Sequence, residues 1–230
     1  MPPPLHTQTV IAFVWDFDKT LIPSNMQDPI FEAYGVDPDV FWAEVDGLVD
    51  HYAHQGVVVQ KDTAYLGHLL TYVREGVFEG LSNEKLFELG ADLVPAPGMP
   101  EFMNAVRDHV LEVPDFAAEG IRVEHYIVST GLRSMVEGSV FADAIDGVWA
   151  NTFIEHVAEP GYMDRLPVAA PSSPISQVGY SIDNTSKTRA LFEINKGVNK
   201  NPELDVNSRM SEDQRRVPMK NMIYIADGPS

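Results

Sequence analysis

The sequence contains no cysteine, which excludes disulfide bonds, thiolate metal ligands and cysteine nucleophiles. Basic residues are few: 16 lysines and arginines stand against 34 aspartates and glutamates, which gives a formal net charge of −18. That charge repels nucleic acids and anionic membranes, so we expect neither as a partner. It also repels phosphate esters, so an enzyme acting on one needs local positive charge from a lysine, a metal ion or backbone N–H groups.

Long apolar runs are also missing. No run approaches the roughly 18 residues of a membrane-spanning helix, and the first residues lack the charged-then-apolar pattern of a signal peptide. We therefore expect a soluble, cytoplasmic protein. Hydrophobic residues make up 44% of the 230, which suits one large or two small domains with a buried core. The composition does not indicate an oligomeric state.

The strongest pattern is an apolar run, Val10–Trp15, that leads directly into Asp16 and Asp18. Its β-branched and aromatic residues, with no glycine or proline, are typical of a strand buried on both faces of a parallel sheet. The two acids then lie at the carboxyl end of the strand, where ligands bind in open α/β sheets. Buried acids cost desolvation energy unless a cation or a substrate compensates, so chemistry explains them better than loop capping.

Later segments predict the rest of an α/β fold. From their apolar spacing we expect helices near residues 100–112, 132–139 and 187–194. Extended segments are predicted in chain order at Val123–Val128, Val148–Ile154, Ser176–Ile182, whose alternation suits a hairpin arm, and Met222–Ala226.

Between the first two strands, from Gln27 to about Val94, apolar residues recur at helical spacing. We expect helices near residues 29–34, 38–54, 63–75 and 83–90, with N-caps at Asp28, Asp37, Asp62 and Ser82. Val57–Val59 is the one possible strand in this block. An all-helical insert between two parallel strands predicts a lid domain.

The residues Asp16-Phe17-Asp18-Lys19-Thr20, preceded by a hydrophobic run, resemble the D-x-D-x-T first motif of the haloacid dehalogenase-like (HAD) hydrolase superfamily. The resemblance implies a Rossmann-like α/β core with a parallel sheet. An insertion after the first motif is the usual place for a cap in this family, as in its phosphoserine-phosphatase-like branch. We therefore expect a discontinuous core at residues 1–22 and 97–230 and a small all-helical cap domain at residues 23–96.

The resemblance also assigns roles to polar residues in the order of the family's motifs. Asp16 would be the nucleophile that forms a phosphoaspartyl intermediate, and Asp18 the general acid and base. Lys187, at a helix start, would neutralise charge on the nucleophile and the phosphoryl group, with Lys196 as the alternative. The expected phosphate-binding residues are Thr20, Ser129, Thr130, Gly131 and Lys187, and the expected Mg²⁺ ligands are Asp16, Asp18 and Asp227.

One position departs from the family's pattern. The fourth motif often carries a second acid four residues after the first, and that position would be 231, beyond Ser230. A HAD-like core normally has at least one more strand and helix, so we expect its C-terminal part to be missing, through fragmentation or natural truncation. The last strand would then be an unprotected edge. Ser129 and Asp227 also fit plainer roles, a helix N-cap and a turn.

Together these residues predict a Mg²⁺-dependent phosphatase that hydrolyses a small phosphorylated metabolite, a phosphomonoester. A haloacid dehalogenase is an alternative, although that reaction needs no acid two residues after the nucleophile. A catalytically silent HAD-like binding module is another. Asn25, Gln27, Trp42 and Tyr65 could reach a substrate from the lid, but loop chemistry and cap packing explain them as well. The sequence does not identify the substrate.

Overall fold

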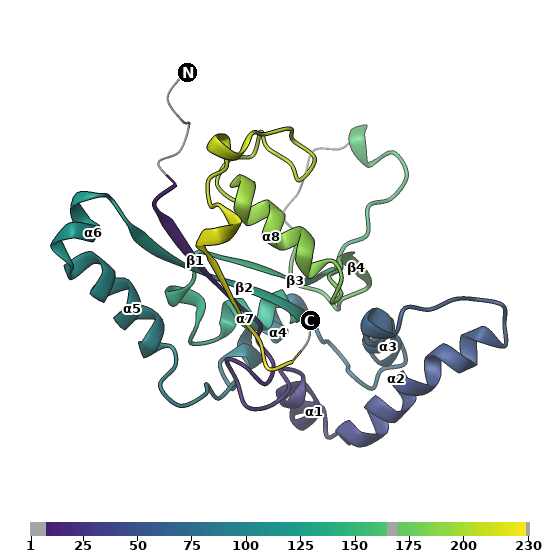
Figure 1. Ribbon diagram of the computed structural model, residues 1–230. Helices are drawn as coiled ribbons and strands as arrows, with labels where there is room; N and C mark the ends of the chain where they lie inside the picture. The colour runs from purple at the N-terminus through teal and green to yellow at the C-terminus, as the bar shows by residue number, and fades with distance from the viewer. Residues whose placement is uncertain (1–7, 165–169, 229–230) are drawn as a thin grey trace.

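The computed structural model describes residues 8–164 and 170–228. Within these ranges the strands form one five-stranded sheet in the order β4–β3–β2–β1–β5. Their bounds are β1 Val10–Trp15, β2 Arg122–Leu132, β3 Gly147–Ile154, β4 Gln177–Tyr180 and β5 Met222–Ile225. All neighbouring pairs are parallel except β3 with β4. The predicted α/β fold, its parallel strands and its hairpin arm are confirmed (Figure 1).

The helices follow the predicted positions closely. The α-helices of the described residues are α1 Asp28–Tyr34, α2 Pro38–Ala53, α3 Lys61–Arg74, α4 Asn83–Gly90, α5 Glu101–Glu112, α6 Pro114–Ala118, α7 Arg133–Gly138 and α8 Lys187–Lys196. Short 3₁₀ turns lie at Ala142–Ala144, Tyr162–Asp164, Glu212–Gln214 and Met219–Asn221. The pattern does not predict α6. Pro114 cannot continue α5, but its fixed φ suits the first turn of another helix. None of the helices in the described ranges is both long and apolar enough to cross a membrane.

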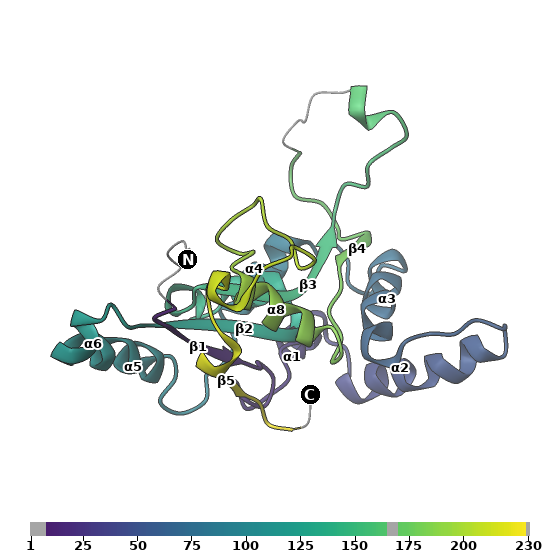
Figure 2. The same ribbon diagram turned by 45° about the horizontal axis from the view of Figure 1, so that its top comes forward.

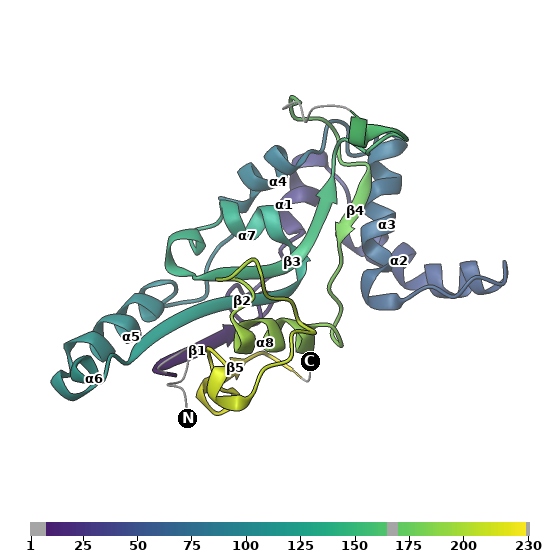
Figure 3. The same ribbon diagram turned by 90° about the horizontal axis from the view of Figure 1, so that it is seen from above.

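Helices cover both faces of the sheet. On one face Trp15 packs in a core with Met135 of α7, and on the other Val14 packs with Ala190 of α8. Successive strand residues point to opposite faces, so an uninterrupted apolar strand supplies both cores. Figure 3 shows α5 and α7 on one side of the sheet and α8 on the other.

The strand register brings the ends of neighbouring strands together. Trp15 pairs with Ile127 of β2 and with Ile225 of β5. One step further, the backbone N–H of Asp16 donates to the carbonyl oxygen of Ile225 at 2.8 Å. The residues at the carboxyl ends of β1, β2 and β5 therefore lie along one edge of the sheet, where ligands bind in folds of this kind.

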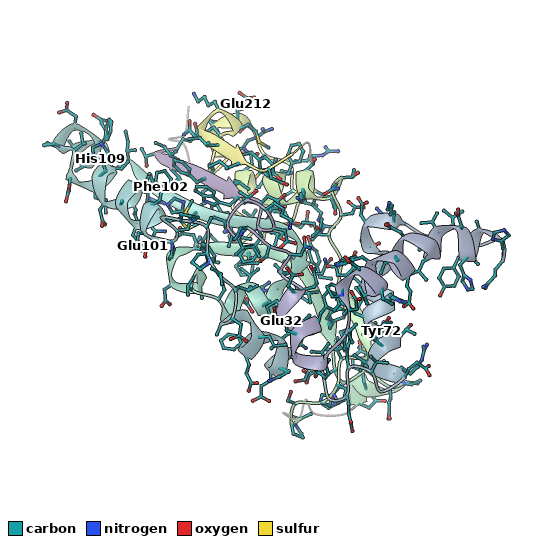
Figure 4. The ribbon with its side chains drawn as sticks, turned by 90° about the horizontal axis from the view of Figure 1, so that it is seen from below. Glu32, Tyr72, Glu101, Phe102, His109 and Glu212 are labelled. Atoms are coloured by element: carbon teal, nitrogen blue, oxygen red, sulfur yellow. The ribbon has the colours of Figure 1, made fainter. Side chains whose placement is uncertain are left out.

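Helices α1 to α4 form the predicted helical insert between β1 and β2. Helices α2 and α3 lie beyond the carboxyl ends of the central strands, and α5 and α6 lie at the opposite end of the molecule (Figures 1 and 2). Figure 4 shows the same separation through Tyr72 of α3 and Phe102 of α5. The possible strand at Val57–Val59 does not form: these residues lie in the loop between α2 and α3, where Val58 is 98% exposed.

The N-cap predictions are half correct. Asp37 and Ser82 are N-caps, and each side chain accepts a backbone N–H of its helix's first turn, at 2.9 and 3.0 Å. The N-cap predictions for Asp28 and Asp62 are wrong, since both acids lie inside the first turn of α1 and α3. The helix dipole favours an acid at either place, so the pattern does not fix the boundary to one residue.

Helix α4 lies directly against α7. A Cβ atom on Gly138 would lie 1.8 Å from the carbonyl oxygen of Phe87, and one on Gly90 would lie 2.3 Å from that of Met135. Only glycine permits this backbone approach. One helix of the insert is therefore packed on a helix that follows β2, whereas α2 projects away from the sheet (Figure 2). The expected domain boundaries at residues 22/23 and 96/97 stay a prediction.

Candidate active site

The chain turns sharply after β1 around one buried aromatic residue. The carbonyl oxygen of Phe17 accepts hydrogen bonds at 2.9 to 3.2 Å from three backbone N–H groups, those of Thr20, Leu21 and Ile22. Lys19 has a φ of 60°, a left-handed conformation that costs energy for a residue other than glycine. Such strain is typical of functional turns. Here it lies directly after the second of the two predicted catalytic acids.

Asp16 is held by groups from two distant parts of the chain. Its Oδ2 atom accepts a hydrogen bond from Lys187 Nζ at 2.9 Å, and its Oδ1 atom accepts one from the backbone N–H of Phe17 at 2.8 Å. Only 14% of the Asp16 side chain and 6% of the Lys187 side chain are exposed. The structure therefore brings together the predicted nucleophile and the lysine predicted to neutralise its charge. Lys196, the alternative lysine, donates instead to two backbone carbonyl oxygens of the loop after α8.

Asp18 combines burial with a neighbouring like charge. Burial raises the pKa of its carboxyl group to about 7; the hydrogen bond from the backbone N–H of Met26, at 2.9 Å, lowers that pKa, and the charge of Asp16 raises it further. A carboxyl group with a pKa near neutrality can both donate and accept a proton at the same pH. Asp18 thus has the property that a general acid and base requires.

Near its carboxyl end, strand β2 is irregular at Ser129, Thr130 and Gly131, where its register with β3 shifts. The backbone N–H of Gly131 donates to Ser129 Oγ at 2.9 Å, and Ser129 is 1% exposed. A hydroxyl group that accepts one hydrogen bond still has its own proton to donate. A Cβ atom on Gly131 would lie 2.4 Å from Met26 Sδ, so the turn after β1 and the end of β2 pack without room for a side chain.

Thr20 differs from the other predicted phosphate-binding residues. Its Oγ1 atom is buried, and no group of the described residues hydrogen-bonds to it. The side chain therefore makes no bond that would orient the turn, and the hydroxyl would need a local movement to reach a ligand. Its role in phosphate binding stays a prediction.

The predicted metal ligands follow two strands: Asp16 and Asp18 come after β1, and Asp227 comes after β5. Asp227 follows β5 with an exposed side chain. Across residues 8–164 and 170–228, no three or more histidine, aspartate or glutamate side chains lie close enough together to hold a metal ion. The donor chemistry nevertheless fits a hard cation. Asp16 and Asp18 supply carboxylate oxygens, burial and then the charge of Asp16 raise the pKa of Asp18, and oxygen donors suit Mg²⁺.

A pocket of about 230 Å³ opens beside Asp18, between the turn after β1 and helices α2 and α3. Its lining residues are Asp18, Asn25, Gln27, Trp42, Val45, Asp46, Lys61, Asp62, Tyr65 and Thr130. Burial, together with the charge of Asp18, raises the pKa of the Tyr65 phenol, which therefore stays protonated at neutral pH. The helical periodicity of α2 and α3 identifies the aromatic residues but not the charged ones at this pocket, because their positions depend on how the helices approach the sheet.

Asn151 of β3 is a site residue that the sequence patterns do not predict. It is 1% exposed, and its side-chain Nδ2 atom donates to the carbonyl oxygen of Thr130 at 2.5 Å. The signal that could have identified it is an amide inside an otherwise apolar strand, because a buried polar side chain needs partners.

Comparisons with known proteins give one relative of substantial identity. No protein-family model matches the chain. An uncharacterized protein of Borreliella burgdorferi is 39% identical over 222 residues, which cover 96% of this chain and 75% of that protein.

Solved structures resemble the fold at low identity. The crystal structure of a HAD family hydrolase from Salmonella enterica serovar Typhi matches with a TM-score of 0.52 and 14% identity. The match covers 97% of this chain and 56% of that one, so this chain spans little more than half of its length. A phosphoserine phosphatase, solved as a phospho-aspartyl intermediate analogue, matches with a TM-score of 0.50 and 17% identity over 96% of this chain and 79% of that one. The chain therefore belongs to the same family as the Borreliella burgdorferi protein, and its fold is the HAD-like, phosphoserine-phosphatase-like fold that its first motif predicts.

Proposed function

We propose that this protein is a phosphohydrolase that cleaves a small phosphomonoester, with Asp16 as the nucleophile. One observation carries the proposal: Asp16, bound to Lys187 Nζ at 2.9 Å, lies two residues from Asp18, whose pKa is about 7. A nucleophilic carboxylate beside a cation and a carboxyl group able to transfer protons at neutral pH is the set of groups that phosphoryl transfer through an aspartate needs. The fold shared with a phosphoserine phosphatase captured as a phospho-aspartyl analogue supports the same chemistry.

The proposed reaction has two steps. In the first, an Asp16 carboxylate oxygen forms a bond to phosphorus as the bond to the leaving oxygen breaks, and protonated Asp18 gives that oxygen its proton. In the second, ionised Asp18 takes a proton from water, which attacks the phosphoaspartate and releases inorganic phosphate and free Asp16. Lys187 balances part of the negative charge in both steps, and Ser129 donates its hydroxyl proton to a phosphoryl oxygen.

Mg²⁺ is the metal that the donor set suits. Asp16, Asp18 and Asp227 are the residues that would hold it, although the described residues do not bring three acids close enough together to do so. When bound, it would supply positive charge to the phosphoryl oxygens. The net charge of −18 makes such a local cation valuable, because the protein as a whole repels an anionic substrate.

The pocket beside Asp18 would hold the leaving group. At about 230 Å³ it is smaller than the usual pocket for a drug-sized ligand, so we expect a small metabolite. Trp42 and Tyr65, which line it from α2 and α3, would keep water from the leaving group during attack.

The test is phosphate release from p-nitrophenyl phosphate with Mg²⁺ by the purified protein and by Asp16→Asn. We expect the variant to lose more than about 1,000-fold in rate, because a neutral amide cannot form the phosphoaspartate. Asp108→Asn, an exposed acid on α5 at the other end of the molecule, is the matched control and should keep full activity. Equal rates for the wild type and Asp16→Asn would remove Asp16 from the mechanism.

A binding module is the second candidate, since the described residues form no group of three acids that could hold a metal. It predicts that the wild type binds orthovanadate or inorganic phosphate through Lys187 without turnover of any phosphomonoester. Halide release from a 2-haloacid would instead favour the dehalogenase, in which Asp18→Asn should keep activity.

A further inference from the structure

We propose that Asn151 is a positioning residue of the active site, whose side-chain amide holds together the irregular last residues of β2, the segment before Lys187 and helix α3. The effect on catalysis rests on the proposed function. The positioning itself rests on contacts within the chain and can be measured without a substrate.

The amide of Asn151 bonds to two separate segments of the site. Its Nδ2 atom donates to the carbonyl oxygens of Thr130 and Gly131, at 2.5 and 3.0 Å, in the irregular part of β2 that begins at Ser129. Its Oδ1 atom accepts the backbone N–H of Ile182 at 2.7 Å. Ile182 lies five residues before Lys187, so one side chain fixes the spacing between the predicted phosphate-binding residues of β2 and the lysine that binds Asp16.

The sheet itself explains why an amide is needed at this place. The register between β2 and β3 shifts between Val128 and Leu132, which pairs with Asn151. The regular ladder of backbone hydrogen bonds is therefore interrupted across residues 129–131. The carbonyl oxygens of Thr130 and Gly131 would lose their partners in a buried region, and the Asn151 side chain supplies them.

Helix α3 joins the same network. The Tyr65 hydroxyl donates to the carbonyl oxygen of Thr130 at 2.5 Å and accepts from Asn151 Nδ2 at 3.1 Å. At the start of α3, the Gln60 side chain donates to the carboxylate of Asp183, which also accepts the backbone N–H of Ser186 at 2.5 Å. The helix that lines the substrate pocket thus contacts both segments that Asn151 connects.

The two side chains closest in shape to asparagine do not meet these requirements. An aspartate would place a carboxylate against two carbonyl oxygens, and a leucine would leave both carbonyl oxygens and the Ile182 N–H without a partner. Because donor and acceptor are used at once, the loss of the amide should release both segments together.

Asn195 provides a matched control. It is also fully buried, and its Nδ2 atom donates to the carbonyl oxygen of Val217 at 2.7 Å. It lies eight residues after Lys187 on α8, about 12 Å along the helix at 1.5 Å per residue, so it is remote from the catalytic edge. Asn151→Leu and Asn195→Leu each remove a buried amide, but only the first touches the two segments.

The experiment measures hydrogen exchange of the full chain by mass spectrometry, together with kcat and KM for p-nitrophenyl phosphate. In Asn151→Leu we expect faster exchange in residues 129–132 and 182–187 and a kcat lower by about 100-fold, the usual effect of a misplaced catalytic group. Asn195→Leu should leave exchange in both segments unchanged and kcat within a few-fold of the wild type. Unchanged exchange in both segments of a folded Asn151→Leu variant, or equal losses in the two variants, would overturn the proposal.

Asn151→Asp keeps the test decisive if the leucine variant does not fold. A protonated carboxyl group supplies one of the two donor hydrogens of the amide and its acceptor, whereas the ionised form supplies no donor. We expect the melting temperature of this variant to approach that of the wild type as the pH falls from 8 to 5. A difference between the two melting temperatures that does not change with pH would contradict the proposal. A wild type that folds but releases no phosphate from any ester would refute the proposed function alone, since the exchange result would still decide the positioning role.

Discussion

Two carboxyl groups of the same sheet show opposite electrostatic behaviour. Burial alone would raise the pKa of Glu124, near the start of β2, but hydrogen bonds from Arg216 and Tyr126 lower it to about 2. Asp18, just after β1, has a pKa of about 7 because burial and the charge of Asp16 outweigh the bond from the Met26 N–H. Where the strands begin, Arg216 balances the charge of Glu124. At the edge where ligands bind, no cation of the described residues balances the charge of Asp18 to the same degree. This difference separates a structural carboxylate from one available for chemistry.

Glu124, whose charge is balanced by Arg216, should cost the protein the most stability when that partner is removed. Arg216 Nη1 donates to Glu124 Oε2 at 2.8 Å, and the two residues are 8% and 6% exposed. Arg216→Met should lower the free energy of unfolding by about 3 to 5 kcal/mol, because it leaves a buried carboxylate without a cation. Urea denaturation at pH 7 measures this loss.

Two further variants show whether the loss of stability comes from the unpaired charge of Glu124. Arg209→Met, an exposed arginine of the loop after α8, should stay within about 0.5 kcal/mol of the wild type. The double variant of Arg216→Met with Glu124→Leu should recover most of the lost stability, since no buried charge remains. A single variant that loses less than about 1 kcal/mol would show that the pair does not stabilise the fold.

The lowered pKa of Glu124 predicts a loss of stability in acid. Because its pKa falls from 4.5 to about 2 on folding, the unfolded state binds more protons between these values. The stabilisation is therefore present above pH 4.5 and is lost as the pH falls towards 2. Glu124→Gln should be less stable than the wild type by about 3 kcal/mol at pH 6, with a gap that closes near pH 2. A gap that is constant with pH would contradict the assignment.

The raised pKa of Asp18 predicts the opposite sign. Its folded pKa of about 7 lies above the ordinary value of 3.8, so the native state binds more protons than the unfolded state between these values. Stability therefore falls as the pH rises from about 4 to 7. In metal-free buffer, Asp18→Asn should be more stable than the wild type by on the order of 2 kcal/mol at pH 8 and equal to it near pH 4.

The same substitution separates stability from function. Asp18→Asn should lose about 100-fold or more in phosphatase rate while gaining stability at pH 8, because the amide can neither donate nor take the catalytic proton. A variant that gains stability and keeps full activity would leave Asp18 outside the reaction. One that is destabilised at pH 8 would mean that its carboxylate is already balanced in the folded protein.

The sequence predicts the fold well because the signals for it are local. The apolar run Val10–Trp15 and the helical spacing of the insert each need only their own residues, and both are confirmed. The acids after β1 are predictable for the same reason. Failures such as Val57–Val59 arise where a short β-branched segment has no strand beside it, since pairing and not propensity forms a strand.

What the sequence does not give is contact between distant segments. Lys187 binds Asp16 across 171 positions of the chain, and a position at a helix start can favour it over Lys196 but cannot show that bond. The pKa of Asp18 depends on how the insert buries it. The hydrogen bonds of Asn151 depend on the shift in register between β2 and β3. No residue pattern in β3 alone encodes that shift.

Substitution of Thr20 has the smallest expected effect, and it tests the turn that carries Asp16 and Asp18. Its Oγ1 atom is buried without a hydrogen-bond partner in the described part of the chain, so Thr20→Val, which replaces the hydroxyl by a methyl group of similar shape, removes an unsatisfied polar atom. We expect the free energy of unfolding to stay the same or rise by up to about 1 kcal/mol. Thr20→Ser, which keeps the hydroxyl, is the control. If phosphatase activity falls in Thr20→Val but not in Thr20→Ser, the turn opens during catalysis and the hydroxyl reaches the phosphoryl group. If neither variant loses activity, the Thr20 hydroxyl affects stability alone and takes no part in catalysis, which then depends on the carboxylates on either side of Phe17.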